Sequence, residues 1–556
     1  MSWFKQLSVE AGLASEPELT KEACDKLSKY VPQTFSLKEL ADEARGCLSL
    51  AHSEKPGEVQ TLRNYLVSIL TCLYFEGRIV HESTTDQDTV RNLARNIAKT
   101  IAPVVTPEAS RSDNTDSLEA PNQDFTKIRR AIFENCRAIS SLGVRALEAL
   151  MNQTEDPVRL DDEVLYTLLV YTDKTQPWEN CEIKASTQRL LEQQFSVPGS
   201  PTKEQFLTET LLKHYLRPLF FKSKPSSITT SGRKAEYTDG AAARAESMPD
   251  ESALTKPWKY TDLRAIPAVA WAVREADTQL IAKHWPLFIP VLLTLVDDPA
   301  TLIRRRGLLI LTDFLAKFSD KTLHDTGLAK VFEDAIFPTL AFLPSLTPED
   351  ESLQLLGPAY GALLSLANKQ PALSMDGISG GPRNALLDKV LRDGVFMGYF
   401  HAKEHVEIVA VLCQQTVAVL TEMGVHAVKH LKDLIPMLSS IMTDPFAPVA
   451  PKMLLSAIKA MQAVLANCWP RIPVSLWQDE IINALVLCWL NVAEHDHADT
   501  DKHHARIEQE LLTSSKALAA VLKTASREGE QATNLSSHVA PLVTKEPRLG
   551  KLFPPN

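Results

Sequence analysis

The chain has 556 residues, of which 44% are hydrophobic and 23% charged, a balance that supports a folded core. Its formal net charge of −10 is mild for this length and argues against an electrostatic nucleic-acid binder, which would carry a basic stripe. Only 20 residues are glycine, which favours helices over sheets. The length fits either several ordinary domains or one long repeat array.

The eight cysteines indicate a reducing compartment, and we expect a cytoplasmic and nuclear location. None forms a C-x-x-C pair, so neither a zinc module nor a thioredoxin-type site is expected. Most lie in apolar helical runs, where a free thiol acts as a small hydrophobe. The N-terminus lacks the apolar stretch of a signal peptide, and no run of about 18 apolar residues predicts a membrane span.

Residues 1–221 form an N-terminal half that is helical by pattern, but without a dependable repeat period. Two capping boxes mark helix starts in it, because a Ser or Thr and a Glu or Gln three residues later bond each other's backbone N–H groups. Ser36 with Glu39 is the first pair, and Thr202 with Gln205 is the second.

Residues 222–257 are rich in Ser, Thr, Ala, charge and Pro, and lack the apolar residues that would offset ordering entropy. They are predicted to be a flexible polar linker, and 106–124 and 370–384 to be shorter loops. Ser110 and Ser247 each precede an Asp by three residues, the spacing that acid-directed kinases favour. An ordinary polar loop shows the same pattern, and this second interpretation is preferred.

Residues 258–556 contain a phrase that recurs. HWPLFIPVLLTLVDDP at 284–299 matches HLKDLIPMLSSIMTDP at 430–445, with a weaker copy at 331–348. The intervals leave room for one further unit near residue 387. A period of about 40–50 residues is typical of a HEAT or armadillo solenoid, so the fold class is predicted as all-α with degenerate N-terminal repeats.

The closing Asp-Pro of the phrase predicts the start of a second helix. Asp298 and Asp444 are predicted to be N-caps, and Pro299 and Pro445 to occupy the first helical position, where a missing N–H is harmless. An interior proline costs about 3 kcal/mol in a straight helix, so each first helix is expected to kink or to start late at its own proline. These prolines are Pro290 and Pro436.

Catalysis finds no support in the motifs of this chain. It contains no G-x-S-x-G, G-x-x-x-x-G-K-[ST], H-E-x-x-H or G-x-G-x-x-G. His495, His497, His503 and His504 crowd one segment and offer metal-ligand chemistry, but a solvated polar loop explains them better because no pair is spaced as ligands on a firm helix. We therefore expect no enzyme, cofactor or metal; an enzyme with an unfamiliar site is the rival class.

Three consecutive arginines at 304–306 begin a second helix. They suit a phosphate or phosphopeptide, but pairing of one of them with Asp297 or Asp298 in the preceding turn is the preferred interpretation. Because the three side chains point in different directions, at least one is expected to be free for a partner.

Aromatic residues near arginine or proline suggest interface hot spots, and equally suggest packed corners between repeats. Trp469 with Arg471 is the main case. Trp178, Trp258 and Tyr260 carry the same two interpretations.

Several phrases occur in the order expected for one protein family. They include RRRGLLILTDFLAKF, GYFHAKEHVEIVAVLCQQ and GVHAVKHLKDLIPMLSSIMTDPFAPVAPKMLLSAIKAMQAVLANCWPRI. Over about residues 284–475 the chain resembles the fungal form of the Tel-two-interacting-protein-two family.

The resemblance implies an α-helical repeat protein that is the smallest subunit of the Triple T complex, together with Tel two and Tel-two-interacting protein one. That complex acts with Hsp90 and the R2TP co-chaperone to support folding, stability and assembly of phosphatidylinositol-3-kinase-related protein kinases, and so telomere maintenance and DNA-damage signalling. The C-terminal repeats would hold the largest subunit, Tel-two-interacting protein one. The family has no catalytic residues.

Within the matched phrases, exposed polar and aromatic residues are the candidate contacts, with apolar anchors rimmed by charge. They are Arg304, Arg306, Lys429, Lys432, Asp433, Trp469 and Arg471. No nucleic acid, membrane or small-molecule substrate is expected. The alternative is another HEAT-type scaffold, such as a transport receptor or a phosphatase scaffold.

Overall fold

The computed structural model describes most of the chain. The described residues are 2–13, 21–48, 56–81, 86–103, 123–154, 157–175, 181–223, 252–371, 381–473, 476–494, 501–527 and 535–554. Ser110, Trp178 and Ser247 lie outside them, as do most of the predicted linker and loops. Among the described residues, the regular elements are helices except for one pair of two-residue strands, which confirms the predicted all-α class.

The described residues group into two compact units, with the boundary between Thr294 and Leu295. Residues 258–294, which the sequence analysis assigned to the C-terminal half, group with the N-terminal unit. Each unit is described below by itself.

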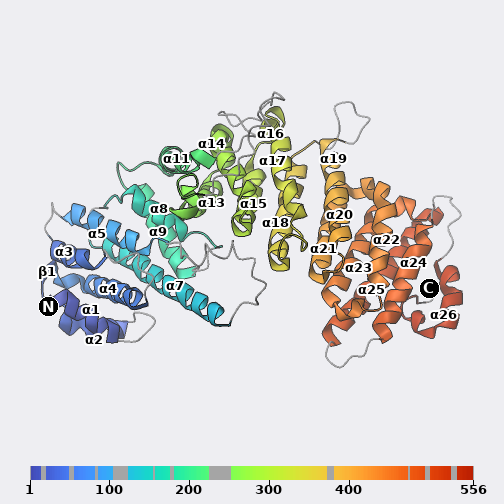
Figure 1. Cartoon of the computed structure of the whole chain (residues 1–556), viewed down its shortest axis with the longest axis horizontal. Helices are drawn as coiled ribbons and strands as arrows, with labels where there is room; N and C mark the ends of the chain where they lie inside the picture. Colours follow the sequence, from blue (N-terminus) through green and yellow to red (C-terminus); the bar gives the residue numbers. More distant parts are fainter. Residues whose placement is uncertain are drawn as a thin grey trace. The chain divides into compact units, whose positions relative to one another are not determined.

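The N-terminal unit is built from two rows of packed helices (Figure 1). One row runs α1–α4–α7–α9, and the other runs α3–α5–α8–α13. The elements are α1 Trp3–Leu13, α2 Lys21–Leu27, η1 Ser28–Tyr30, β1 Phe35–Ser36, α3 Leu37–Leu48, α4 Pro56–Tyr74, η2 Glu76–Arg78, β2 Ile79–Val80, α5 Asp86–Ile101, α7 Gln123–Met151, α8 Asp162–Val170, α9 Cys181–Ser196, α10 Lys203–Gln205, η3 Phe206–Leu216, α11 Arg217–Phe220, η4 Phe221–Ser223, α12 Pro257–Tyr260, α13 Ala265–Glu275 and α14 Thr278–Asp297, whose last turn belongs to the second unit.

Both predicted capping boxes are confirmed. The Glu39 N–H donates to Ser36 Oγ at 3.2 Å, and the Ser36 N–H donates to Glu39 Oε2 at 3.1 Å. Thr202 and Gln205 make the same reciprocal pair. Each box satisfies two N–H groups that a helix start leaves without partners.

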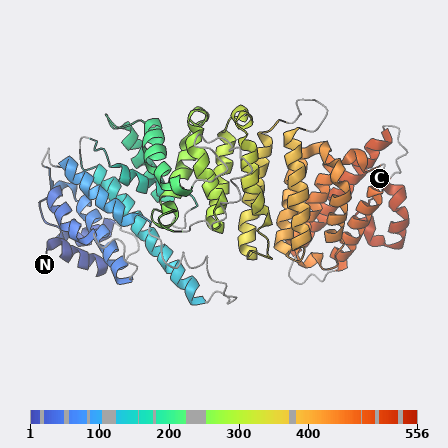
Figure 2. The same ribbon diagram turned by 45° about the horizontal axis from the view of Figure 1, so that its top comes forward.

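The C-terminal unit consists of helix pairs, seen from two directions in Figure 1 and Figure 2. Its elements are α15 Thr301–Lys317, α16 Asp320–Asp325, α17 Leu328–Ile336, η6 Phe337–Ala341, α18 Glu349–Asn368, α19 Pro382–Lys389, η7 Val390–Phe396, α20 Met397–Ala402, α21 Val406–Met423, η8 Gly424–His430, α22 Leu431–Met442, η9 Ala447–Val449, α23 Pro451–Asn467, η10 Trp469–Arg471, α24 Trp477–Glu494, α25 Asp501–Arg527, α26 Leu535–Lys545 and η11 Pro547–Gly550.

The second helices of successive pairs stack in one row, α15–α18–α21–α23–α25. The matching first helices are α17 with η6, α19 through α20, α22 and α24. The unit predicted near residue 387 is therefore present, as α19 through α20 followed by α21. Each pair buries its apolar face against its neighbours, so the predicted helical-repeat solenoid is confirmed.

The predicted role of Asp298 and Asp444 as N-caps is wrong. The Asp298 carboxylate accepts the N–H of Ala300 at 3.0 Å, and the cap residue of α15 is Ala300. Asp444 likewise accepts the N–H of Phe446 at 2.9 Å, well before α23 begins at Pro451. An Asp side chain readily accepts the backbone N–H of the residue two positions later, which forms an Asx-turn. Both Asp residues therefore stabilise the turn and do not cap the helix that follows.

The prolines of the first helices lie inside them. Pro290 stands in α14 together with Pro286, and Pro436 stands in α22. The late helix start offered as one outcome at these residues does not occur. Because Pro290 has no N–H, it removes the helix hydrogen bond that would reach the carbonyl of Pro286. The Thr294 hydroxyl donates to the carbonyl of Pro290 at 2.7 Å, the usual bond of a helical Thr to the residue four positions earlier.

Two stretches are long and apolar enough to span a membrane by length and composition alone, Thr278–Asp297 and Val406–Met442. The expectation that the chain has no such stretch therefore needs correction. Half of each apolar window is buried inside the structure. The second stretch is also interrupted at Gly424, where φ is +55°, and it forms α21 and α22 rather than one helix.

The last described segment closes the final helix pair. Leu549, Leu552 and Phe553 are buried. The Trp489 ring N–H donates to the carbonyl of Arg548 at 3.1 Å, and the Ser515 hydroxyl donates to the carbonyl of Leu552 at 2.8 Å. Residues 547–553 therefore cover apolar surface of α24 and α25.

Candidate partner-binding surfaces

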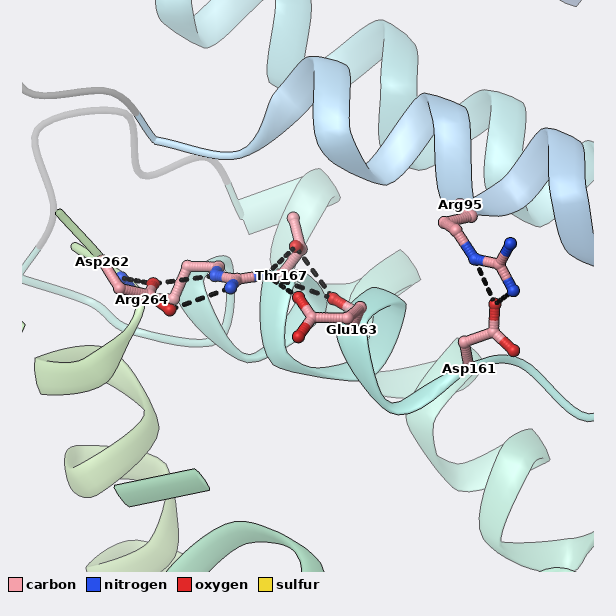
Figure 3. Close-up of polar contacts among 6 residues, drawn as sticks. All are labelled: Arg95, Asp161, Glu163, Thr167, Asp262 and Arg264. Carbon is pink, nitrogen blue, oxygen red and sulfur yellow. Dashed lines mark hydrogen bonds and ion pairs between the residues drawn. The ribbon is translucent and has the colours of Figure 1, made fainter. Parts of the chain in front are cut away.

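A charged cluster in the N-terminal unit borders a cleft of about 440 Å³. Figure 3 shows the polar contacts of the cluster. Arg264, between α12 and α13, holds Asp262 with two hydrogen bonds of 2.8 Å, Nε to Oδ1 and Nη2 to Oδ2. Its Nη1 donates to Glu163 Oε2 in α8 at 2.8 Å. Nearby, Arg95 Nε in α5 donates to Asp161 Oδ2 at 2.7 Å.

The cluster braces three elements and has little attraction for an anion. Arg95, Lys99 and Arg264 line or border the cleft, and Asp161, Glu163 and Asp262 offset their charge. Burial alone would raise the pKa of Asp262, but the hydrogen bonds and charge of Arg264 outweigh it and leave that pKa below its ordinary value. We assign the cluster a structural role.

Replacing Arg264 by Gln is expected to lower the local unfolding free energy by about 2–3 kcal/mol at pH 7, because a buried carboxylate loses its partner. Ionised Asp262 contributes to the unfolding free energy above its ordinary pKa, near 4, and this contribution is lost as pH falls through the lower pKa of the folded state. The difference in unfolding free energy between wild type and variant should therefore become smaller below about pH 4. Hydrogen exchange of the α8 amides measures this difference at each pH.

Lys213→Gln is the control for this prediction. Lys213 pairs with Glu209 on an exposed helix face, and removing such a solvent-screened pair should leave stability nearly unchanged. A gap for Arg264→Gln that stays constant from pH 7 to pH 3 would show that the Asp262 carboxylate is not its source.

Histidine-based metal binding gains no support. His495 and His497 lie outside the described residues, while His504 lies 3.4 Å from Glu508 along α25. Within the ranges that the structure describes, no group of three or more His, Cys, Asp or Glu side chains is arranged to hold an ion.

The C-terminal unit has two edges, which we name by their connections. The loop edge holds the connections from one pair to the next, and it includes η8 and η10. The turn edge holds the turns within each pair. Those within the described residues lie at 298–300, 342–348, 403–405 and 443–450.

The structure brings five of the seven predicted contact residues to the loop edge, where η8 contacts η10. Lys429 pairs with Asp388, which His430 also contacts at 2.9 Å. Lys432 and Asp433 are exposed on the first turn of α22. On η10, Trp469 is half-buried and Arg471 is exposed.

The other two candidates lie near the turn edge. Arg304 is only 8% exposed; it donates from Nε to the Asp298 carbonyl at 3.0 Å and from Nη2 to the Asp297 carbonyl at 3.2 Å. Arg304 therefore contacts both of the residues predicted to pair with it, but through their backbone carbonyls and not their carboxylates. It is buried and is not an exposed contact. Arg306 is half-buried, and Arg305 is the exposed member of the three.

Trp258, left open between interface and core, belongs to the core. It is fully buried, stacks on Phe220 with ring centroids 4.9 Å apart, and donates from its ring N–H to Ser223 Oγ at 2.9 Å. Tyr260 lines the cleft of the N-terminal unit.

Sequence reasoning missed the exposed apolar residues of the turn edge. The turns and the helix ends beside them carry large side chains that face solvent. They are Leu302, Leu346, Phe400, Val406, Phe446 and Val449. Phe446 directly follows the Asp-Pro of the recurring phrase. Its place in a predicted turn was the only sequence feature that indicated its exposure.

Comparison with known proteins identifies the family. The model of the Tti2 family matches residues 164–449, from the third residue of α8 to the end of η9. This is more than half of the 556 residues. The chain belongs to the Tti2 family. Membership in the Tti2 family, that of Tel2-interacting protein 2, implies a role related to the Triple T cochaperone complex.

The Tti2 match begins in the N-terminal unit, well before the phrases that carried the resemblance, and ends at residue 449, within the last of those phrases. Among curated proteins none matches the chain. A solved structure described as a "Circular tandem repeat protein with novel repeat topology and enhanced subunit contact surfaces" is 14% identical over 95% of this chain and 98% of that chain. Its TM-score of 0.23 is too low to carry an argument.

Proposed function

We propose that the chain is a non-catalytic scaffold subunit of the Triple T complex. Its C-terminal repeats bind the large subunit, Tel2-interacting protein 1. Tel2 is the third subunit, and the complex acts with Hsp90 and R2TP to support folding and assembly of phosphatidylinositol-3-kinase-related protein kinases. Its location is cytoplasmic and nuclear. The observation that carries the proposal is the Tti2-family match over a stack of helix pairs that offers extended surfaces.

Affinity purification of the tagged full-length chain from its native cells, read by mass spectrometry, tests this proposal. Recovery of both other subunits, followed by reconstitution of the complex from purified proteins, is the expected result. Recovery of transport cargo or phosphatase subunits in their place would support the other HEAT-type scaffolds and overturn the proposal.

The loop edge supplies polar contacts in this proposal. Reversing charge with Lys429→Glu and Lys432→Glu should weaken binding of the large subunit by less than about tenfold, because exposed rim charges act mainly on the association rate. Lys429 also loses Asp388, but that pair is half-exposed and contributes little to stability. Surface plasmon resonance with the large subunit measures both rates.

Lys213→Glu in the N-terminal unit serves as the control for overall charge. Unchanged association of the double variant, with Lys213→Glu also unchanged, would remove Lys429 and Lys432 from the interface.

A further inference from the structure

The turn edge of the C-terminal unit exposes large apolar side chains from successive repeats. Leu346 is 87% exposed, Phe400 71% and Phe446 77%. Leu302, Val406 and Val449 are exposed as well. Single exposed apolar residues are common on protein surfaces, but a row of them along one edge marks an interaction surface.

Hydrogen bonds and ion pairs between successive repeats place the helix starts that adjoin these residues in one row. The Thr301 hydroxyl at the start of α15 contacts Glu351 of α18. Glu349 of α18 lies 3.0 Å from His405, just before α21. Glu407 of α21 pairs with Lys452 of α23. The starts of four second helices are thus neighbours in sequence order, and each exposed apolar residue lies within a few residues of one of these contacts.

Carboxylates outnumber cations around the row. The exposed or half-buried carboxylates of the four turns and adjoining helix starts are Glu349, Asp350, Glu351, Glu404, Glu407 and Asp444. The cations with the same exposure are Arg305, Arg306, Lys403 and Lys452. A partner that covers the row therefore meets apolar side chains rimmed by negative charge, and complementarity calls for Lys or Arg on its side.

We propose that the turn edge docks a face of the large subunit in which apolar side chains are flanked by Lys and Arg. This inference rests on the proposed function, since it names the surface by which the C-terminal repeats hold that subunit. Along α22, Lys432 lies only about 15 Å from the turn edge. A standard interface of about 800 Å² per partner spans that distance, so loop-edge residues form its rim and the apolar row its centre.

The test is Leu346→Ser combined with Phe400→Ser, with binding of the purified large subunit measured against the full-length chain. Large side chains at an interface centre supply most of the binding, so the double variant should lose about 30-fold or more in affinity. Adding Phe446→Ser should weaken binding further. The three positions are exposed, so the melting temperature should not change.

Leu254→Ser combined with Phe221→Ser is the matched control. These residues are 79% and 70% exposed in the N-terminal unit, close to the exposure of the test pair. The control should bind as the wild type does. A second arm raises the salt concentration and tests Glu404→Lys: affinity should fall with salt, and Glu404→Lys should slow association several-fold.

The outcomes separate this inference from the proposed function. If the wild-type chain does not bind the large subunit, the proposed function fails. If the wild type binds and the Leu346 and Phe400 double variant binds equally well, the turn edge is not the docking surface, while the proposed function stands. Loss of binding by the control pair to the same degree would also overturn the inference. Binding unaffected by salt and by Glu404→Lys would overturn the basic character of the partner face.

Discussion

Replacing Gly307 by alanine is expected to destabilise the C-terminal unit by about 2 kcal/mol. A Cβ atom at this position of α15 would lie 2.7 Å from the backbone carbon of Leu295 and 2.9 Å from the backbone nitrogen of Val296. Backbone atoms cannot move aside as a flexible side chain can. The clash therefore outweighs the gain of about 1 kcal/mol that alanine brings to a helix. Chemical denaturation, with hydrogen exchange of the α15 amides, measures the effect.

The same substitution at Gly361 should have the opposite sign. Gly361 lies in α18, and no atom stands within 4 Å of the Cβ that alanine would add. Alanine there should stabilise the unit by about 0.5–1 kcal/mol through helix propensity alone. Equal stability of the two alanine variants would show that α15 does not approach residues 295–296 as closely as described.

Replacing Arg304 by methionine should cost about 3 kcal/mol, the largest effect expected of the substitutions considered. The guanidinium bonds two backbone carbonyls and Thr339 Oγ1, and lies 4.5 Å from the ring centroid of Phe342. Methionine keeps the apolar volume but leaves the carbonyls of Asp297 and Asp298 without these bonds. Chemical denaturation of the full-length chain, with hydrogen exchange of the α15 amides, measures the loss.

Arg305→Met is the control for that experiment, since Arg305 is the exposed neighbour on the same helix. It should change stability by less than about 0.5 kcal/mol. A similar effect of the two substitutions would mean that the loss reflects total charge and not the buried contacts of Arg304.

The repeat architecture could be predicted from the sequence because burial imposes a period. Leu292, Leu340 and Leu438 recur at matched places in first helices, and all three are buried. The spacing of the recognisable copies also predicted the position of the unit that contains α19 through α20. The copy of the phrase in that unit is too degenerate to recognise. Capping boxes were equally predictable, because their hydrogen bonds are local.

The candidate surfaces could be predicted only in part. Lys432 and Arg304 look alike in sequence, each a cation at the start of a helix, yet one faces solvent and the other is buried. The difference depends on Phe342 and Thr339, which the fold brings to Arg304 from another pair. The exposure of Phe400 and Phe446 likewise depends on which surfaces the neighbouring repeats cover. The local sequence pattern does not predict this.

The segment around Leu549, Leu552 and Phe553 also bears on self-association. A stack of helix pairs can in principle be continued by another molecule placed end-on, which leads to open-ended polymers. Here those side chains already occupy the apolar surface of the last pair, and Trp489 and Ser515 bond their backbone. Growth of a filament from this end would first have to displace them.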